Sequence, residues 1–528
     1  MSTDKSQVTH SRKNLVKSSS IISTGILFSR FLGFIRDVVL ANLLGTGIVA
    51  EAFFVAQRIP NLLRDLVGEG AANAAIVPVL VEYQKTKTKE QWRQLVNVLL
   101  AWGVIVLGIL TALGMIFADK IVRMMAPGFI ADAAKYHLTV DLTRIMFPYL
   151  ILVALTALQM GVLYTLNSYG APAFSSCLLN IAMIMSVWIA SFFSWGAAYI
   201  LAVGVIIGGI LQLLLQSQAL AKLGFVWLWP RKFRHDGMKK IAQLLLPRLW
   251  GSAVYQMNIF IDTLCASLAF IVGSGGIAAI YFANRLIQFP LGVFAYALSS
   301  ASLASLSSSA SDKDYVTFKQ TLMFSLRNLL FVLLPCAAYL VVLSPLLVKT
   351  IFQHGAFDHH SADITTMALA FLSLGLPFFG ASRILVSGFY ALQDTKTSVR
   401  IATVCLLVNA VLNLLLMFPL KIGGIALASS ISGLINFTLL FNTLNQQLDG
   451  TKGVLKKFFL RLIPSLFVMA SVMFLLSMYM DLNNGFIKLI LISIAGWGSF
   501  LFCCHFTGVP EFRPVWKTVK RKLITYLK

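Results

Sequence analysis

The sequence predicts an all-α polytopic membrane protein, because three properties of the chain agree. It has 528 residues, of which 58% are hydrophobic and only 12% are charged, so most of its length is too apolar for a water-soluble globule. Its mean hydropathy is +0.82. Apolar runs of about 20 residues, the length that a helix needs to cross the bilayer, recur along the chain. Such runs exclude a membrane β-barrel, whose short strands alternate in polarity.

Fourteen runs are long enough to be transmembrane helices. The first seven cover residues 19–40, 50–81, 95–117, 138–166, 173–193, 199–220 and 241–272, and the others cover 277–308, 321–343, 362–390, 399–417, 422–444, 458–480 and 486–505. The second and eighth runs exceed what a straight span needs, and they contain Pro60 and Pro78, and Pro290, respectively. We therefore expect bent or tilted helices at these two places.

The basic residues predict the orientation of the chain. With fourteen spans and both ends on one side, the inner segments carry 28 Lys and Arg residues and the outer segments carry six. This positive-inside bias predicts that both termini lie in the cytoplasm, and residues 1–18 read as an uncleaved cytosolic tail. The net charge of +23 then reflects topology and attraction to anionic membrane lipids, and we expect no nucleic-acid partner.

Four short segments recur later in the chain at a nearly constant distance. Residues 53–58 resemble 280–285, and three further pairs of segments lie 224 to 226 residues apart. This repeat predicts two pseudo-symmetric six-helix lobes, 19–222 and 241–448, joined by a basic cytosolic linker, 223–240. Two further helices lie in 449–508, followed by a basic tail, 509–528. Transporters built from two such repeats bind their substrate between the lobes.

Five arginines lie inside the predicted spans and are the strongest functional candidates. They are Arg30, Arg36, Arg58, Arg64 and Arg285. A guanidinium group at the centre of a bilayer costs at least ~2.5 kcal/mol, so residues of this kind usually face a wet cavity. Their planar, forked donors suit phosphate or diphosphate oxygens. The sequence therefore predicts an anion site, and buried structural ion pairs are the alternative reading.

Neighbouring polar residues refine this prediction. On an ideal helix Asp37 points within ~20° of Arg30, and Ser29 adds a hydroxyl group. In the second span we expect Arg64 and Glu69 to serve the site. For Arg58, packing of a polar stripe is an equally good explanation, and Arg285 holds the matching place in the second repeat. Arg144, Arg248 and Arg327 lie near the ends of predicted helices, where snorkelling to the membrane surface is a sufficient explanation. The sequence does not decide between the two explanations for Arg383.

Three oxygen-bearing side chains are candidate cation ligands. Asp262 is an isolated acid in the seventh span, and Asn409 and Asn413 lie four residues apart on one face of the eleventh. They could hold Na⁺, or Asp262 could carry a proton, whereas hydrogen-bonded helix packing is the alternative.

Motifs for nucleotide-driven or hydrolytic chemistry are missing from the sequence. It contains no GxxxxGK[ST], HExxH or GxSxG pattern. We therefore predict a transporter without catalytic residues or a resident cofactor, driven by an ion gradient such as Na⁺ or by the membrane potential.

Several motifs together resemble the MurJ (MviN) family of lipid II flippases, within the multidrug/oligosaccharidyl-lipid/polysaccharide exporter superfamily. They are Phe28–Asp37, Ala52–Ala56, Pro60–Arg64, Glu69–Ala71, Val77–Pro78, Ala126–Phe129, Phe147–Tyr149, Arg285–Leu286, Phe289–Pro290 and Gly292–Val293. The resemblance covers nearly the whole chain.

The resemblance implies a fold, a substrate and a location. It implies fourteen helices around a cationic cavity, and alternating access that carries lipid II, an undecaprenyl-diphosphate-linked disaccharide-pentapeptide, across the bacterial cytoplasmic membrane. We expect the protein to act as a monomer. The last two helices would form a groove for the polyprenyl tail.

The resemblance also assigns roles to residues. Arg30, Arg36, Arg64 and Arg285 would bind the diphosphate, Asp37 and Ser29 would support them, Asn180 would contact the substrate, and Asp262, Asn409 and Asn413 would match a Na⁺ site. The chain departs from the family at Asn284 and Gln288, where acids are frequent, and at Glu51, where Asp is frequent.

Two other functions stay open at this point. An exporter of another polyprenyl-diphosphate-linked glycan would share the arginines, whereas a drug exporter would carry acids in their place. A membrane-bound polyprenyl-lipid transferase would need acidic or histidine residues clustered at one membrane face, and only residues 358–360 come close.

Overall fold

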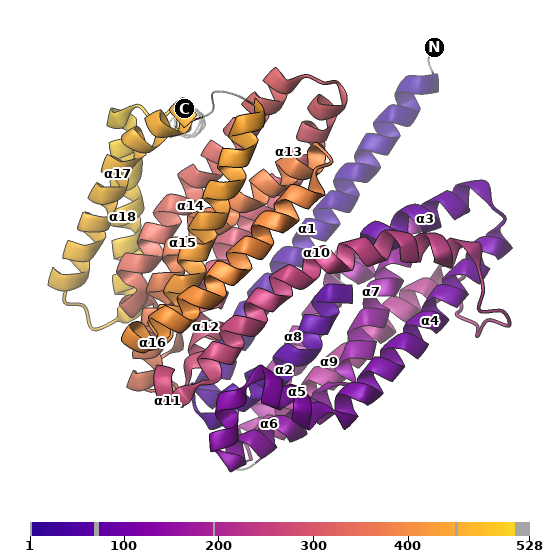
Figure 1. Ribbon diagram of the computed structural model, residues 1–528, viewed down its shortest axis with the longest axis horizontal. Coiled ribbons are helices and arrows are strands. Elements are labelled where there is room, and N and C mark those ends of the chain that lie inside the picture. The colour runs from indigo at the N-terminus through magenta and orange to yellow at the C-terminus, as the bar shows by residue number, and fades with distance from the viewer. Residues whose placement is uncertain (1–2, 68–72, 194–195, 449–451, 513–528) are drawn as a thin grey trace, which may run out of the picture. The chain divides into compact units, whose positions relative to one another are not determined.

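The computed structural model describes residues 3–67, 73–193, 196–448 and 452–512, and all regular structure within these ranges is helical (Figure 1). Ten helical stretches of the described part are long and apolar enough to cross a membrane. The all-α membrane fold is therefore confirmed, while the count of fourteen spans stays a prediction. The chain divides into two compact units, Met1–Ser267 and Leu268–Lys528, which we call unit 1 and unit 2.

Unit 1 is a bundle in which early and late helices pack together. Its elements are α1 (Thr3–Leu44), α2 (Ile48–Val67), α3 (Asn73–Thr86), α4 (Lys89–Ile116), α5 (Ala118–Met125), the 3₁₀ helix η2 (Pro127–Ala131), α6 (Ala133–Met146), α7 (Tyr149–Thr165), α8 (Gly170–Ala190), α9 (Ala197–Lys222) and α10 (Asp236–Ser267). Helix α8 packs between α1 and α9, and α2 packs on α6. Helix α4 starts at a capping box, in which Thr88 and Gln91 satisfy each other's backbone N–H groups.

A close approach of α1 to α8 positions the first arginines. A Cβ atom at Gly25 would lie only 2.6 Å from the carbonyl oxygen of Ala173, so any larger residue would push the two helices apart. Further along the same interface, Gly33 faces the side chain of Asn180. The glycines of α1 therefore allow the close approach that brings Arg36 next to the amide of Asn180 on α8.

Unit 2 is built around α15. Its elements are α11 (Ala269–Val272), α12 (Gly276–Pro290), the π-helical turn η3 (Leu291–Ala295), α13 (Tyr296–Ser311), α14 (Tyr315–Phe352), α15 (His359–Ala391), α16 (Thr395–Leu448), α17 (Lys452–Tyr479) and α18 (Gly485–Thr507). Helix α15 packs on α14 and α16, and α17 and α18 form a hairpin against α14. A hydrogen bond of 2.8 Å between the hydroxyl groups of Tyr339 and Ser493 ties α14 to α18.

Both runs that exceed the length of a straight span contain more than one helical element. The second run forms two helices, α2 and α3, on either side of residues 68–72. The eighth changes from α-helix to one π-helical turn directly after Pro290, because proline has no N–H to continue the α-helical ladder. The eleventh and twelfth runs are joined in α16, which is interrupted at Lys421 (φ 50°, ψ −128°).

Candidate functional site

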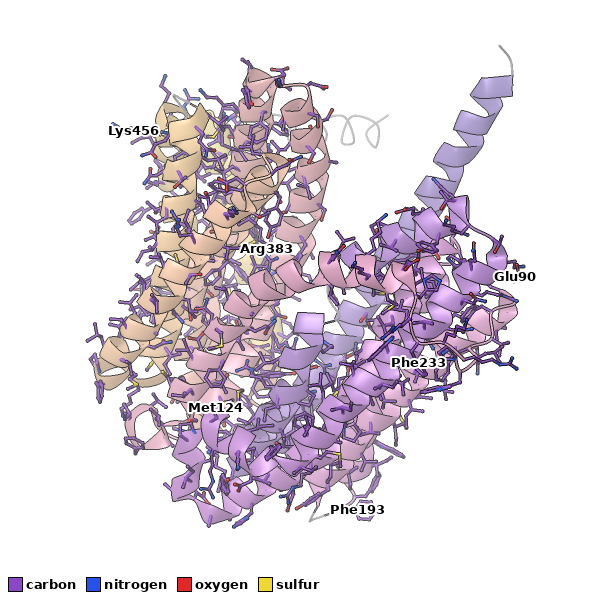
Figure 2. The ribbon with its side chains drawn as sticks, turned by 45° about the vertical axis from the view of Figure 1, so that its right-hand side comes forward. Glu90, Met124, Phe193, Phe233, Arg383 and Lys456 are labelled. Carbon is purple, nitrogen blue, oxygen red and sulfur yellow. The ribbon has the colours of Figure 1, made fainter. Side chains whose placement is uncertain are left out.

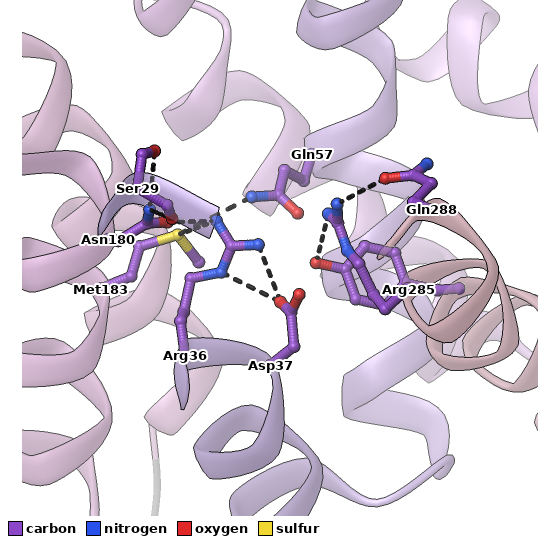
Figure 3. A network of polar contacts seen from close by, with 9 residues as sticks. Ser29, Arg36, Asp37, Gln57, Asn180, Met183, Arg285 and Gln288 are labelled. Carbon is purple, nitrogen blue, oxygen red and sulfur yellow. Dashed lines mark hydrogen bonds and ion pairs between the residues drawn. The ribbon is translucent and has the colours of Figure 1, made fainter. Parts of the chain in front are cut away.

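The clearest polar network of unit 1 surrounds Arg36 (Figure 3). Arg36 donates to Asp37 Oδ1 from Nε at 3.0 Å and from Nη2 at 2.8 Å, and its Nη1 donates to Asn180 Oδ1 at 2.9 Å. Arg36 is 8% exposed and Asp37 is 2% exposed. Three hydrogen bonds on two sides of the guanidinium group fix the plane in which its donors lie.

Asn180 connects this network to the preceding turns of α1. Its Nδ2 donates to the carbonyl oxygen of Ser29 at 2.9 Å and lies 3.5 Å from the hydroxyl oxygen of Ser29. The amide of Asn180 therefore satisfies a backbone acceptor with one end and orients Arg36 with the other. The structure thus brings together Ser29, Arg36, Asp37 and Asn180, and their contact with a substrate stays a prediction.

Two further members of the network, Met183 and Gln57, are not predicted from the sequence. The thioether sulfur of Met183, one turn after Asn180, lies 4.0 Å from Arg36 Nη1 and 3.9 Å from Gln57 Nε2. A methionine and a glutamine in apolar helices are normally core residues, so only the fold could reveal their position.

The other predicted residues of unit 1 differ in their surroundings. Arg30 and Arg64 are partly buried. Arg58 Nη1 donates to Thr263 Oγ1 at 2.6 Å, which links α2 to α10. This contact agrees with a role of Arg58 in helix packing, and its role in substrate binding stays a prediction. Glu69 lies outside the described residues.

A buried ion pair joins α2 to α6. Lys135 Nζ contacts Glu51 Oε2, and the two side chains are 7% and 3% exposed. The ammonium group also lies 3.8 Å from the ring centroid of Phe129. The sequence predicts Lys135 in an outer segment and does not identify it as the partner of Glu51.

In unit 2, Arg285 is held by neutral groups of its own helix. Its Nη2 donates to the hydroxyl oxygen of Tyr281 at 2.9 Å, its Nη1 donates to Gln288 Oε1 at 3.3 Å, and its Cζ lies 4.6 Å from the centroid of the Tyr281 ring. Figure 3 shows Gln288 turned toward the guanidinium group. Gln288, at a position where acids are frequent in the family, thus still contacts Arg285.

A second arginine of unit 2 lies on an aromatic ring. Arg383 Nη2 donates to the hydroxyl oxygen of Tyr296 at 2.8 Å, and the guanidinium carbon lies 3.9 Å from the ring centroid. The sequence left Arg383 open, because its partner belongs to another helix, 87 residues away.

Arg327 and Arg144 differ although both were expected to snorkel. Arg144 fits, since its side chain is 50% exposed and lies 3.8 Å from Asp141. Arg327, whose side chain is 24% exposed, forms an ion pair with Glu511 just after α18, and the Glu511 side chain is 5% exposed. The sequence did not identify this partner, and snorkelling of Arg327 stays a prediction.

The candidate cation ligands fall in both units. Asp262 belongs to α10 of unit 1 and is partly buried, whereas Asn409 and Asn413 lie buried on α16 of unit 2. Among the described residues, His, Cys, Asp and Glu form no group of three that could hold a metal ion. The Na⁺ site therefore stays a prediction.

The loop before α15 has structural roles for its polar residues. Asp358 caps α15 by accepting from the backbone N–H of Ser361 at 2.8 Å. This bond lowers the pKa of the Asp358 carboxyl group. His359 contacts Gln353, and His360 contacts the carbonyl oxygen of Ser274. These contacts give no support to a transferase centre at residues 358–360.

Long apolar helices in both units define a polytopic membrane protein. The family profile described as "Lipid II flippase MurJ" matches residues 40–494. The chain is 35% identical over 435 residues to a probable lipid II flippase MurJ of Buchnera aphidicola subsp. Acyrthosiphon pisum, covering 82% of this chain and 84% of the relative. It is 34% identical to the lipid II flippase MurJ of Burkholderia cenocepacia, and this match covers 87% of this chain and 90% of the relative. The chain belongs to the MurJ family.

Solved structures agree with this assignment. A lipid II flippase MurJ in an inward closed conformation matches with a TM-score of 0.78 and 26% identity, covering 92% of this chain and 98% of that one. An inward-facing MATE family multidrug transporter of the MOP superfamily matches with a TM-score of 0.69 at 12% identity, and this match covers 79% of this chain and 94% of the transporter. At this low identity the second likeness shows a shared fold and nothing more.

Proposed function

We propose that the protein is a lipid II flippase of the bacterial inner membrane, with both termini in the cytoplasm. The observation that carries the proposal is the network of Arg36, Asp37, Asn180 and Ser29 within a bundle of the MurJ family. Its ligand is the diphosphate of an undecaprenyl-linked disaccharide-pentapeptide.

The network suits a diphosphate for a physical reason. Asp37 and Asn180 fix the guanidinium plane of Arg36 before a ligand arrives, so little side-chain entropy is lost on binding. Asp37 also stabilises the guanidinium group while no phosphate is present, because a buried charge needs a compensating partner. When a diphosphate binds, its oxygens compete with the single Asp37 oxygen for the same donors.

Arg30, Arg64 and Arg285 stay predicted ligands of the same substrate. We infer a secondary-type mechanism of alternating access, reset by Na⁺ or by the membrane potential, since the sequence has no ATP-binding motif. Asp262, Asn409 and Asn413 are the residues that would hold Na⁺. Helices α17 and α18 would accommodate the polyprenyl tail, and the protein would work as a monomer.

Lipid binding by the purified protein tests this proposal. The protein in nanodiscs is titrated with lipid II, undecaprenyl phosphate and an unrelated glycolipid. We expect wild type to prefer lipid II by more than tenfold, and Arg36→Ala to lose that preference. Arg144→Ala, which removes an exposed guanidinium group, is the matched control and should bind as wild type does. Equal binding of all three lipids by wild type and Arg36→Ala would refute the assignment.

A further inference from the structure

The segment between α9 and α10, residues 223–235, runs along α4 instead of projecting away from the bundle. Three side chains of α4 hold its main chain. Arg93 donates to the carbonyl oxygen of Gly224, Asn97 Oδ1 accepts from the N–H of Leu228 at 3.2 Å, and Trp102 Nε1 donates to the carbonyl oxygen of Phe233 at 3.1 Å. Successive contacts move forward along α4 and along the segment at the same time. The segment therefore follows α4 from Arg93 to Trp102, which is about 13 Å along the helix axis.

These contacts place the segment beside the membrane-spanning part of α4. Lys89–Ile116 is one of the candidate spans. Trp102 lies 13 residues after the first residue of α4, or about 20 Å along the helix axis. Trp102, Val106, Ile109 and Leu113 form an exposed apolar stripe on one face of this helix. In a membrane such a stripe faces lipid, and Phe233 contacts its first residue. Figure 2 marks Phe233 and, at the start of α4, Glu90.

The segment itself exposes four consecutive apolar residues. Phe225 anchors it, since this ring is buried against Trp92 at a centroid distance of 5.9 Å. The next residues are exposed, and Val226 and Leu228 are each 66% exposed. Trp227 and Trp229 contact each other at 5.7 Å. A run of this kind in contact with water is unfavourable, so it indicates a surface that something apolar covers.

The charges around the run indicate what covers it. The segment and its ends carry Lys222, Arg231, Lys232, Arg234, Lys239 and Lys240 against the single acid Asp236. All these basic side chains are exposed. Tryptophan rings beside basic residues are typical of the boundary between acyl chains and anionic headgroups. The continuous path from the lipid-facing stripe of α4 favours the bilayer over a protein partner.

We propose that residues 224–234 form an interfacial finger that inserts into the leaflet around unit 1 and binds anionic phospholipid. Val226 and Leu228 contact acyl chains beside the first turns of α4, whereas the long side chains of Arg231, Lys232 and Arg234, which start further along α4, extend back to lipid phosphates. The finger is fastened to α4 and leads directly into α10, so it anchors the first turns of both helices at the membrane surface. This role is independent of the lipid that the protein transports.

Spin-label depth measurements test the insertion. A nitroxide is attached to Leu228→Cys and, as the matched control, to Glu90→Cys in the full-length protein in phosphatidylglycerol nanodiscs, with the signal of the unsubstituted protein subtracted. We expect the label at position 228 to collide mainly with oxygen, and the label at position 90 mainly with an aqueous nickel complex. Equal access of nickel to both labels would overturn the proposal. A label that is shielded in native membranes but open to nickel in nanodiscs would also overturn it, because a protein partner would then be the occupant.

Matched charge changes test the lipid preference. Arg231→Gln, Lys232→Gln and Arg234→Gln are combined in one variant, and Lys85→Gln, Lys87→Gln and Lys89→Gln in another with the same charge change. We expect phosphatidylglycerol to raise the Tm of wild type and of the second variant relative to phosphatidylcholine, and at least half of that rise to be lost in the first. Equal losses in both variants, or no loss in either, would show that the finger has no special affinity for anionic lipid.

Discussion

The role of Asn180 can be tested by comparing two substitutions. Asn180→Ala removes the acceptor of Arg36 Nη1 and the donor to the Ser29 carbonyl group. A hydrogen bond to a charged group contributes about 1.5–3 kcal/mol, so we expect lipid II affinity to fall about 10- to 100-fold. Asn180→Asp keeps the shape of the side chain but adds a negative charge where Oδ1 lies 2.9 Å from Arg36 Nη1. It should therefore bind the anionic diphosphate more weakly than the alanine variant.

The order of the two variants decides between electrostatic and packing roles. Kd values for lipid II are measured on proteins of matched thermal stability. Ser186→Ala on the same helix is the control, because Ser186 is buried and its hydroxyl group donates to the carbonyl oxygen of Ala182 within its own helix. If Asn180→Asp binds lipid II as wild type does while Asn180→Ala is weak, Asn180 fills space and the electrostatic reasoning is wrong.

Three further outcomes follow from the ion pairs and the cap. Glu51→Gln leaves Lys135 buried without its carboxylate partner and should lower the free energy of unfolding in mixed micelles by about 3–5 kcal/mol. Adding Lys135→Met should restore most of this loss. If the double variant is no more stable than Glu51→Gln, the ion pair does not stabilise the protein in this way. Glu511→Gln should accelerate proteolysis at the end of α18, because Arg327 loses its partner; unchanged cleavage would argue against this anchor. Asp358→Ala removes the N-cap of α15 and should lower the free energy of unfolding by about 1 kcal/mol at neutral pH. Folding lowers the pKa of the Asp358 carboxyl group, so its contribution to stability is complete above the ordinary pKa of a carboxyl group. This contribution disappears as the pH falls through the lower pKa of the folded state. The thermal stabilities of wild type and Asp358→Ala should therefore converge in acid. A difference that is constant with pH would contradict the cap.

Local patterns predicted the helices and some of their side-chain pairs. Apolar runs indicate helices because hydrogen bonding inside a helix depends only on nearby residues. Pro290 marked the interruption of the eighth run for the same reason. The contacts of Arg285 with Tyr281 and Gln288 lie four and three residues away, which is the spacing of neighbours on a helix surface.

Contacts between distant helices could not be read from spacing. Arg36 and Asn180 are 144 residues apart, and Lys135 and Glu51 are 84 apart. Asn180 entered the predicted site only through the family resemblance. Lys135 was missed because a lysine after a proline- and glycine-containing turn is normally solvated. The partner of Arg327 was missed because the distance of Arg327 from a helix end says nothing about Glu511, whose position depends on how the α17–α18 hairpin packs on α14.

Translocation in cells is the most direct test of the central claim, that arginines of the apolar helices carry a lipid-linked diphosphate across the membrane. Lipid II in the outer leaflet is measured in cells whose own flippase has been depleted. We expect wild type to restore it, whereas Arg36→Ala and Arg285→Ala insert at equal levels and do not. Normal amounts of outer-leaflet lipid II with either arginine variant would contradict the account.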